Sequence, residues 1–138
     1  RAERLGVPAA LEWGGRVEHD KVPDELRRMD VFIALSKLDS ESFGVAVIEA
    51  SACGLPVVVS NVGGLPEVVV EGVTGCVVQK MDATAAAEKI RMLMGSPELR
   101  ERMGNAGRER VRLHYEWGSC VDRMLDVLRE AADQKVVR

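Results

Sequence analysis

Hydrophobic and polar positions follow two different patterns along the chain, and the change falls near residue 82. Between Leu11 and Asp82, short apolar runs that are typical of strands alternate with stretches of helical periodicity. From Ala83 onward the pattern is helical almost to the end. Strands joined by helices in this way form parallel sheets with right-handed crossovers. The pattern therefore predicts an α/β domain that ends in a run of helices.

The strand predictions rest on short apolar runs, and the helix predictions rest on capping residues and on Gly or Pro at the ends. Residues 31–36 and 57–60 are nearly continuous apolar runs, as expected for strands that are covered on both faces. Strands are predicted at Leu11–Val17, Val31–Ser36, Val57–Ser60 and Gly75–Val78. Helices are predicted at Val22–Met29, Phe43–Cys53, Pro66–Val70, Ala83–Met94, Pro97 to about His114 and Glu116 to about Ala132.

The last predicted helix has one apolar face, and we interpret it as packing on the domain rather than binding a partner. That face consists of Val121, Met124, Leu125 and Leu128. The aromatic residues around its start, His114, Tyr115 and Trp117, predict a packed cluster between the last two helices. We expect a single domain over residues 1–138, in which residues 132–138 form a ragged, mobile tail.

The composition, 138 residues with 46% apolar and 30% charged, is that of one ordinary soluble domain. The net charge of −3 and the few aromatic residues, two Phe, two Trp and one Tyr, argue against a nucleic-acid partner. No apolar run approaches the ~18 residues of a membrane-spanning helix. Arg108, Arg110 and Arg112 lie among acidic residues at ion-pairing spacing, which predicts a solvated helix face.

The three cysteines, Cys53, Cys76 and Cys120, form an odd set with no CxxC pair and no His at metal-binding spacing. A reducing, cytoplasmic location is the simplest interpretation. The sequence begins at Arg1 without an initiator Met or a leader, so we expect a fragment of something longer.

Candidate chemistry is concentrated where the strand predicted at 31–36 leads into the next helix. There Glu41 is followed by Ser42, Phe43 and Gly44, and Glu49 stands within the helix. Ligands of open α/β sheets bind at such seams, because helix amides and the helix dipole attract anions such as a diphosphate. Gly44 has no Cβ and lets a phosphate approach the backbone. The Glu49 carboxylate suits two adjacent hydroxyls, as in a ribose.

A purely structural interpretation stays open for these residues. In it, Glu41 caps the helix and Glu49 is solvated. Against it stands the position of Glu49 in VAVIEASACG, where a carboxylate on an otherwise apolar helix requires a partner.

The segment ESFGVAVIEASACGLPVVVSNVGGLPEVVVEGVTGCVV resembles the donor-binding signature of retaining glycosyltransferases of GT-B fold, the glycosyl transferases group 1. That family includes glycogen synthase-like and phosphatidylinositol mannosyltransferase-like enzymes. The similarity extends to RVEHDKVPDELRRMDVFIALS before the segment and to PELRERMGNAGRERV after it. The resemblance implies a Rossmann-like parallel sheet with flanking helices, the C-terminal half of a GT-B fold, here lacking its first two β/α units.

The resemblance also implies a role for each acid of the E-x7-E pattern. Glu41 would be the catalytic residue beside the transferred sugar, and Glu49 would bind the ribose hydroxyls. Backbone amides toward the sugar and the diphosphate would come from Ser42, Phe43, Gly44 and Val45. The nucleotide base would be bordered by Gly15, Arg16 and Val17.

The activity implied by the family is that of a hexosyltransferase of the EC 2.4 class. It would move a sugar from a UDP-, GDP- or ADP-type donor to a hydroxyl of a glycan, lipid or metabolite. The family mechanism needs no metal ion and no cofactor, because the helix dipole and basic side chains stabilise the leaving diphosphate. The parent enzyme would be cytoplasmic, or peripheral at the inner face of the membrane, and its acceptor would bind to a missing N-terminal domain.

The sequence departs from the family where two opening β/α units would supply a Gly-Arg and a Lys that clamp the diphosphate. We therefore expect the isolated chain to bind a donor weakly and to transfer nothing. Without those units the strand predicted at Val31–Ser36 would have an unpaired apolar edge, which predicts self-association.

Two other functions stay open. A non-catalytic nucleotide-binding or interaction module would have the same half-domain fold, and a reading frame that begins at Arg1 would favour it. A flavodoxin-like binder is the weaker alternative, because LEWGGRV is a poor phosphate loop.

Overall fold

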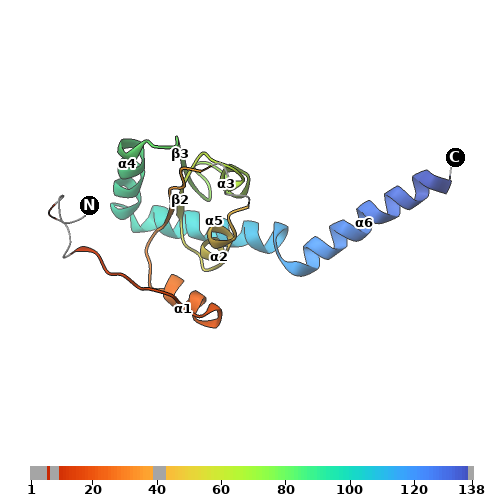
Figure 1. The fold of residues 1–138 in the computed structure, drawn as a ribbon, viewed down its shortest axis with the longest axis horizontal. Coiled ribbons are helices and arrows are strands. Elements are labelled where there is room, and N and C mark those ends of the chain that lie inside the picture. The colour runs from red at the N-terminus through yellow and green to blue at the C-terminus, as the bar shows by residue number, and fades with distance from the viewer. Residues whose placement is uncertain (1–5, 7–9, 39–42, 137–138) are drawn as a thin grey trace.

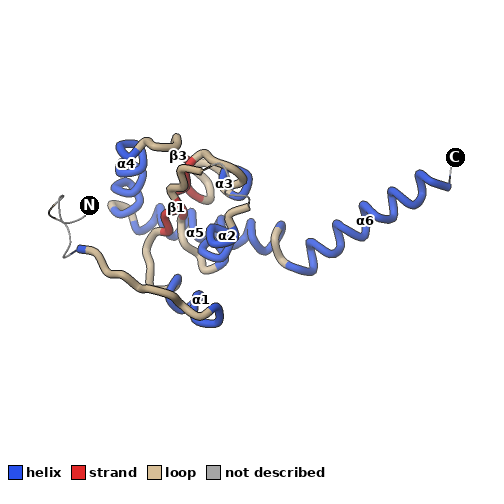
Figure 2. Tube along the Cα trace, viewed as in Figure 1, coloured by secondary structure: helices blue, strands red, loops and turns tan. Residues whose placement is uncertain are grey.

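The computed structural model describes residue 6 and residues 10–38 and 43–136, with side chains as far as residue 133. Its centre is a parallel sheet of three strands in the order β1-β2-β3, drawn in red in Figure 2. The strands are β1 (Phe32–Ala34), β2 (Val57–Ser60) and β3 (Gly75–Val78). The predicted parallel α/β sheet is confirmed.

Helices cover both faces of the sheet (Figure 1). Their bounds are α1 (Val22–Leu26), α2 (Val45–Ala52), α3 (Leu65–Val68), α4 (Ala83–Met94), α5 (Pro97–His114) and α6 (Trp117–Val136). Val57 and Val59 face a core formed with α1, α2 and α3, whereas Val58 faces a second core formed with α4 and the start of α5. Because side chains alternate along a strand, β2 contributes to both cores and is fully buried.

Side-chain caps explain why α4 and α5 begin where they do. The Asp82 carboxylate accepts a hydrogen bond of 2.8 Å from the Ala85 amide, and the Ser96 hydroxyl accepts one of 3.2 Å from the Leu99 amide. Each bond satisfies an amide that has no acceptor within its helix. The predicted bounds of α4 and α5 are confirmed.

Helix α5 packs closely against the end of α2 through small residues. A Cβ at Gly104 would overlap the carbonyl oxygen of Gly54, so only glycine allows this approach. Arg108 Nε donates to the Ala52 carbonyl at 3.0 Å, and Arg110 donates to carbonyls at the end of α3. The prediction of a solvated, ion-paired arginine face is therefore confirmed for Arg112, which pairs with Glu109. Arg108 is exposed as predicted but bonds to a backbone carbonyl, and Arg110 is half-buried, so the prediction is wrong for Arg110.

Strand β1 lies at the edge of the sheet, and its residues pair only with β2 among the described residues. The expectation that this strand is covered on both faces is wrong. Ile33 lies on the same face as Val58 yet is 44% exposed, because α4 packs mainly over β2 and β3. The exposed apolar edge predicted for this strand is present.

Residues 11–18 form no strand, contrary to the prediction for Leu11–Val17. All of them are exposed, including Trp13. A strand requires a hydrogen-bonding neighbour, and this segment pairs with none of the described strands. The apolar pattern of residues 11–17 does not by itself provide a hydrogen-bonding neighbour.

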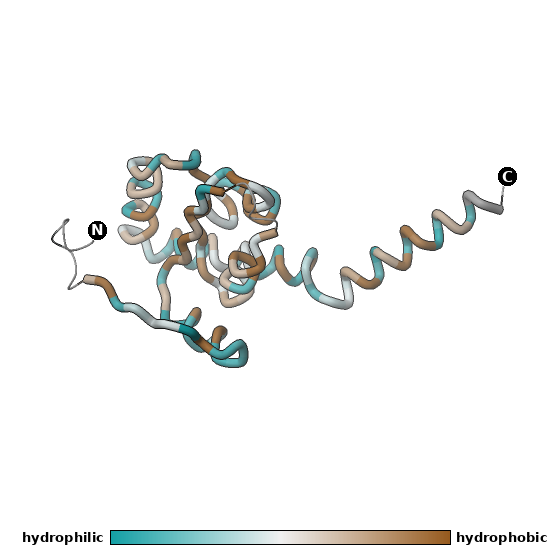
Figure 3. Tube along the Cα trace, viewed as in Figure 1, coloured by the Kyte–Doolittle hydropathy of each residue, from teal (hydrophilic) through white to brown (hydrophobic). Residues whose placement is uncertain are grey.

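Helix α6 projects away from the rest of the molecule (Figure 1), so the interpretation that its apolar face packs on the domain is wrong. Figure 3 shows hydrophobic and hydrophilic residues alternating along it, and Met124, Leu125 and Leu128 are exposed. Trp117 is 81% exposed and takes no part in the expected aromatic cluster, which consists of His114 and Tyr115 with Phe43. The helix continues to Val136, through residues expected to form a ragged tail.

Candidate functional site

The N-terminus of α2 is the best-defined part of the predicted site. Gly44 precedes the helix with φ 74° and ψ 43°, the left-handed conformation that favours glycine. A Cβ at Gly44 would lie 2.8 Å from Leu65 Cδ2 in α3. Both the backbone conformation and the close packing against α3 therefore explain a glycine in the ESFGV motif.

Among the described residues, no side chain caps this helix end, and its first turn, residues 45–48, contains no acidic residue. The Gly44 carbonyl accepts hydrogen bonds from the Val47 and Ile48 amides at 2.9 and 3.2 Å, whereas the earlier amides have no acceptor within the helix. Phe43 is 48% exposed and Val45 is 60% exposed, so the helix end lies at the surface, although Gly44 between them is buried. Open amides at the positive end of a helix dipole favour an anion.

Glu49 is half-buried on the side of α2 that faces α1. It lines a pocket of about 310 Å³ together with His19, Pro23 and Cys53. Among the described residues its carboxylate has no hydrogen-bonding or ion-pairing partner, so its oxygens are open to hydroxyl groups of a ligand. The volume lies in the range of small-molecule sites.

His19 lies on the wall of the Glu49 pocket and was absent from the predicted site residues. In the sequence it stands two positions after Val17, in the segment assigned to the nucleotide base, and that proximity was the available signal. His19 begins the 3-10 turn His19–Lys21 directly before α1, and the packing of α1 against α2 brings His19 and Glu49 to one pocket. No local periodicity reports such a contact.

The other predicted site residues are placed differently. Gly15, Arg16 and Val17 lie in the exposed segment before α1 and do not line the Glu49 pocket. Glu41 and Ser42 lie outside the described residues. Their assigned roles stay predictions.

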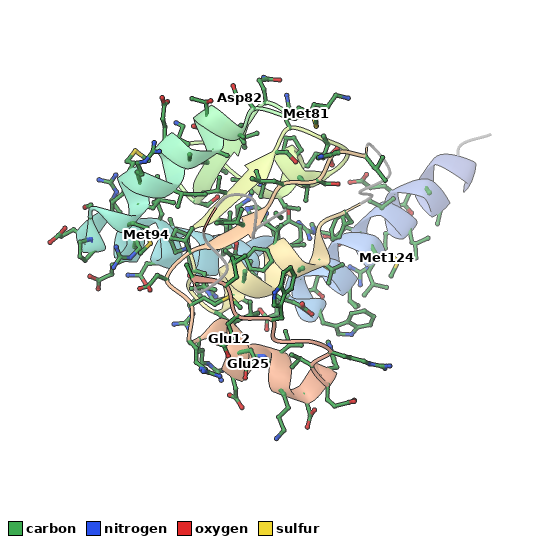
Figure 4. All side chains as sticks on the ribbon, turned by 60° about the vertical axis from the view of Figure 1, so that its left-hand side comes forward. Glu12, Glu25, Met81, Asp82, Met94 and Met124 are labelled. Carbon is green, nitrogen blue, oxygen red and sulfur yellow. The ribbon has the colours of Figure 1, made fainter. Side chains whose placement is uncertain are left out.

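A second pocket, of about 270 Å³, lies at the carboxyl ends of the three strands. Ser36, Ser60 and Gln79 contribute polar groups to it, and the Ser60 hydroxyl donates to the Ser36 carbonyl at 2.8 Å. Met81 and Asp82 form its rim before α4 (Figure 4), and Met81 has a positive φ of 67°. Ligands of open α/β sheets bind along this edge.

The shifted titrations lie elsewhere in the structure. Burial raises the pKa of the Cys76 thiol, and the neighbouring Glu71 carboxylate raises it further. A hydrogen bond to Glu71 raises the pKa of Lys89. In the described part of the chain, no group of three or more His, Cys, Asp or Glu side chains has the arrangement of a metal site.

The fold is the C-terminal half of GT-B glycosyltransferases. The chain matches sucrose-phosphate synthase from Thermosynechococcus elongatus with a TM-score of 0.81 and 28% identity, over 96% of this chain and 33% of that one. Anabaena Alr3699/HepE in complex with UDP matches with a TM-score of 0.85 over 94% of this chain and 35% of that one. At 22% identity, the second likeness shows the fold alone.

The family described as glycosyl transferases group 1 matches residues 1–110, and this chain belongs to it. A GDP-mannose-dependent monoacylated alpha-(1-6)-phosphatidylinositol monomannoside mannosyltransferase of Corynebacterium glutamicum is 33% identical, over 89% of this chain and 33% of the relative. D-inositol 3-phosphate glycosyltransferase of Streptomyces coelicolor is 35% identical, over 94% of this chain and 28% of the relative. The chain spans about a third of the length of the curated relatives it matches. Within its described residues, no helix has both the length and the apolar character needed to cross a bilayer.

Proposed function

We propose that this chain is the donor-binding part of a retaining glycosyltransferase that transfers a hexosyl group to a hydroxyl acceptor. The observation that carries the proposal is the N-terminus of α2, which no described side chain caps, with the Glu49 carboxylate further along the same helix, which has no partner among the described residues. The diphosphate binds the amides around Gly44 and Val45, and Glu49 accepts hydrogen bonds from the ribose hydroxyls. Glu49 stands four residues after Val45, about 6 Å along the axis, a separation that a ribose bridges.

Transfer of the sugar would use groups on both sides of the helix end. The helix dipole stabilises the negative charge that develops on the leaving diphosphate, a role for which no metal ion is required. Glu41 lies beside the transferred sugar in this proposal, with Ser42 at its hydroxyls. The base lies in the pocket between α1 and α2, next to the segment that holds Gly15, Arg16 and Val17.

Names of similar proteins support this donor class. One relative is named GDP-mannose-dependent, and Alr3699/HepE forms a complex with UDP-glucose. The acceptors in the relatives' names, a phosphatidylinositol monomannoside and D-inositol 3-phosphate, support a hydroxyl acceptor that binds outside this third of the enzyme. Three free cysteines support a cytoplasmic location.

The test is a thermal-shift and calorimetric titration with UDP-glucose, GDP-mannose, ADP-glucose and the free nucleoside diphosphates. A bound ligand raises the melting temperature by mass action. We expect one nucleotide series to stabilise the chain and Glu49→Gln to abolish the shift. Glu88→Gln, which removes an exposed carboxylate from α4, is the matched control and leaves the shift intact. Equal losses in both variants, or no binding by the folded wild-type chain, would contradict the proposal.

A non-catalytic interaction module is the second candidate, and the exposed apolar face of α6 favours it. A folded chain that binds none of these nucleotides would support this candidate instead.

The exposed edge of β1 further suggests that the isolated chain self-associates. Light scattering after size exclusion tests this, and we expect Ile33→Lys to shift the chain toward monomer. A wild-type chain that is already monomeric would contradict self-association.

A further inference from the structure

The end of α5 lies against two elements that border the N-terminus of α2. In its last turns, Arg110 donates hydrogen bonds to the Glu67 carbonyl at 3.0 Å and to the Val68 carbonyl at 3.3 Å. These carbonyls belong to the last two residues of α3, and carbonyls at a helix end lack partners within the helix. Arg110 therefore fixes α3 relative to α5.

Tyr115 immediately follows α5 and makes the second contact. Its ring meets the ring of Phe43 edge-on, with centroids 6.0 Å apart and planes at 76°. Tyr115 also packs against the core that contains residues of α2 and α3. Phe43 directly precedes Gly44, so this contact holds the residue next to the N-cap of α2.

Two contacts therefore support Gly44. Leu65 and Val68 of α3, which Arg110 anchors, lie where a Cβ of Gly44 would point, and the preceding residue, Phe43, contacts Tyr115. A left-handed backbone conformation persists where its surroundings determine it. Both supports come from the end of one helix, although Arg110 and Tyr115 lie more than 60 positions after Gly44 in the sequence.

We propose that Arg110 and Tyr115 are positioning residues that hold the N-terminus of α2 in the orientation needed to bind the donor diphosphate. The expected effect on diphosphate binding rests on the proposed function, whereas the expected effect on the position of Gly44 does not. Neither residue touches the diphosphate in this proposal, because Arg110 acts through α3 and Tyr115 acts through Phe43. Misplacement of donor groups by about 1 Å is enough to cost binding and rate.

Hydrogen exchange tests the positioning without a ligand. The amides of Val47 and Ile48 donate to the Gly44 carbonyl, so their exchange reports whether Gly44 stays in place. We expect Tyr115→Leu to accelerate their exchange at least about fivefold and Tyr115→Phe, which keeps the ring edge, to leave it unchanged. Exchange in α4 serves as the internal reference. Unchanged exchange at Val47 and Ile48 in Tyr115→Leu would overturn the proposal for Tyr115.

Phe43→Leu removes the other partner of the contact from an exposed position, so it covers the case in which Tyr115→Leu fails to fold. We expect it to accelerate the same amides, and the double variant to match the single ones, because both remove one contact. Additive effects of the two substitutions would contradict a shared role.

For Arg110 the matched control is Arg112, which lies two residues later on the same helix and pairs with Glu109 at the surface. We expect Arg110→Gln to accelerate exchange at Val47 and Ile48 and Arg112→Gln to leave it unchanged. Equal effects would show general loosening of α5 and would overturn the positioning role.

A ligand series then separates this inference from the proposed function. We expect Tyr115→Leu and Arg110→Gln to weaken a nucleoside diphosphate and its sugar ester about tenfold, with little change for the free nucleoside, which needs only the Glu49 pocket. Equal weakening of nucleoside and diphosphate would overturn the positioning role at the diphosphate. If the wild-type chain binds no nucleotide while exchange responds as expected, the proposed function fails and the positioning of Gly44 stands.

Discussion

The two ends of α2 differ in how their backbone groups are satisfied. At the C-terminal end, Arg108 donates to the Ala52 carbonyl, the Leu55 amide donates to the Ala50 carbonyl at 3.1 Å, and Gly104 of α5 packs against Gly54. At the N-terminal end, Gly44 supplies no cap and the first turn contains no acid. As far as the described residues show, the same helix is closed at one end by protein groups and open at the other.

This difference is specific to α2 among the longer helices whose caps the structure describes. Asp82 and Ser96 precede helices α4 and α5, and their side chains accept hydrogen bonds from backbone amides in the first turns. Caps of this kind stabilise a helix by about 1 kcal/mol. A helix that lacks one at a solvent-open end forgoes that stabilisation, and such departures from local rules are characteristic of functional sites. The closed end of α2 serves stability, whereas the open end is the one that we propose to bind the donor diphosphate.

The largest effect on stability is expected at the closed end, from Gly104→Ala. Its Cβ would overlap the Gly54 carbonyl oxygen, and two backbone segments would have to separate. We expect a loss at or above the upper end of the roughly 1–3 kcal/mol range for overpacking, measured as the free energy of unfolding in urea. Gly118→Ala in α6, where a Cβ meets nothing within 4 Å, is the control and should be neutral or slightly stabilising. Similar losses in both variants would show that the close approach of α5 to α2 is unimportant.

At the open end, Gly44→Ala is expected to destabilise by about 1–3 kcal/mol, because it combines a left-handed backbone with a close contact to Leu65. Gly72→Ala separates the two causes. Gly72 has the same φ of 74°, yet its Cβ would meet nothing within 4 Å. The difference in unfolding free energy between the two variants therefore measures the contact with Leu65. A Gly72 variant as unstable as the Gly44 variant would assign the whole effect to the backbone.

A smaller loss of unfolding free energy is expected from Arg108→Gln, which removes one of the contacts at the C-terminal end of α2. The variant removes the hydrogen bond from the guanidinium to the Ala52 carbonyl, for an expected loss of about 1 kcal/mol in urea unfolding. Arg102→Gln is matched in charge, since Arg102 is exposed on the same helix. If the two variants lose the same amount, overall charge rather than the closed helix end explains the change.

Adding an acid at the N-terminal end of α2 should raise the stability of the protein and lower its affinity for nucleotide. Ala46→Glu places a carboxylate in the first turn of α2, which should raise the free energy of unfolding by about 0.3–1 kcal/mol through the helix dipole. The same charge should weaken a bound nucleoside diphosphate, measured by calorimetry. Ala83→Glu makes the identical change in the first turn of α4 and should leave nucleotide affinity unchanged. Unchanged affinity in Ala46→Glu would place the diphosphate elsewhere.

Elements specified by local signals were predicted accurately from sequence. Strands β2 and β3 and helices α4 and α5 have the predicted bounds, because apolar runs and the residues Asp82, Ser96 and Pro97 act over a few positions. Predictions failed where the outcome depends on a distant partner. Residues 11–17 lack a strand to pair with, and α6 has an apolar face without a described surface to cover it.

The candidate site divides in the same way. Gly44 was assigned to the site because it lacks a Cβ where a strand leads into a helix, and Glu49 because a carboxylate stands out in an apolar segment, whereas the role of Val45 came from the family resemblance; all three roles stay predictions. His19 stands two residues after Val17, near the segment assigned to the base, but a single His in a loop is more often a polar residue at a helix start; the packing of the helices is what shows that it lines the Glu49 pocket. Contacts between elements far apart in sequence carry no periodic signal in a single chain.

The smallest effect is expected in the titration of acids at helix starts. Hydrogen bonds from its own backbone amide and from the Ser96 hydroxyl hold the pKa of Glu98, in the first turn of α5, below its ordinary value of 4.5. The folded state therefore binds fewer protons than the unfolded state near this pH. The resulting stabilisation is present above about pH 4.5 and is lost as the pH falls through the folded-state pKa.

Carbon-13 NMR of the Glu98 carboxyl group, followed through an acid titration, measures this directly. We expect Ser96→Ala to move the pKa of Glu98 back toward its ordinary value, since one of the two hydrogen bonds is lost. In Ala46→Glu, the new carboxyl group should likewise titrate below the ordinary value, because it faces the unsatisfied amides of α2. Nucleoside diphosphate should suppress that second shift, since the ligand and the carboxylate compete for the same amides. If the carboxyl group introduced by Ala46→Glu has an ordinary pKa that nucleotide does not change, the N-terminus of α2 does not attract negative charge, and the contrast between the two ends fails.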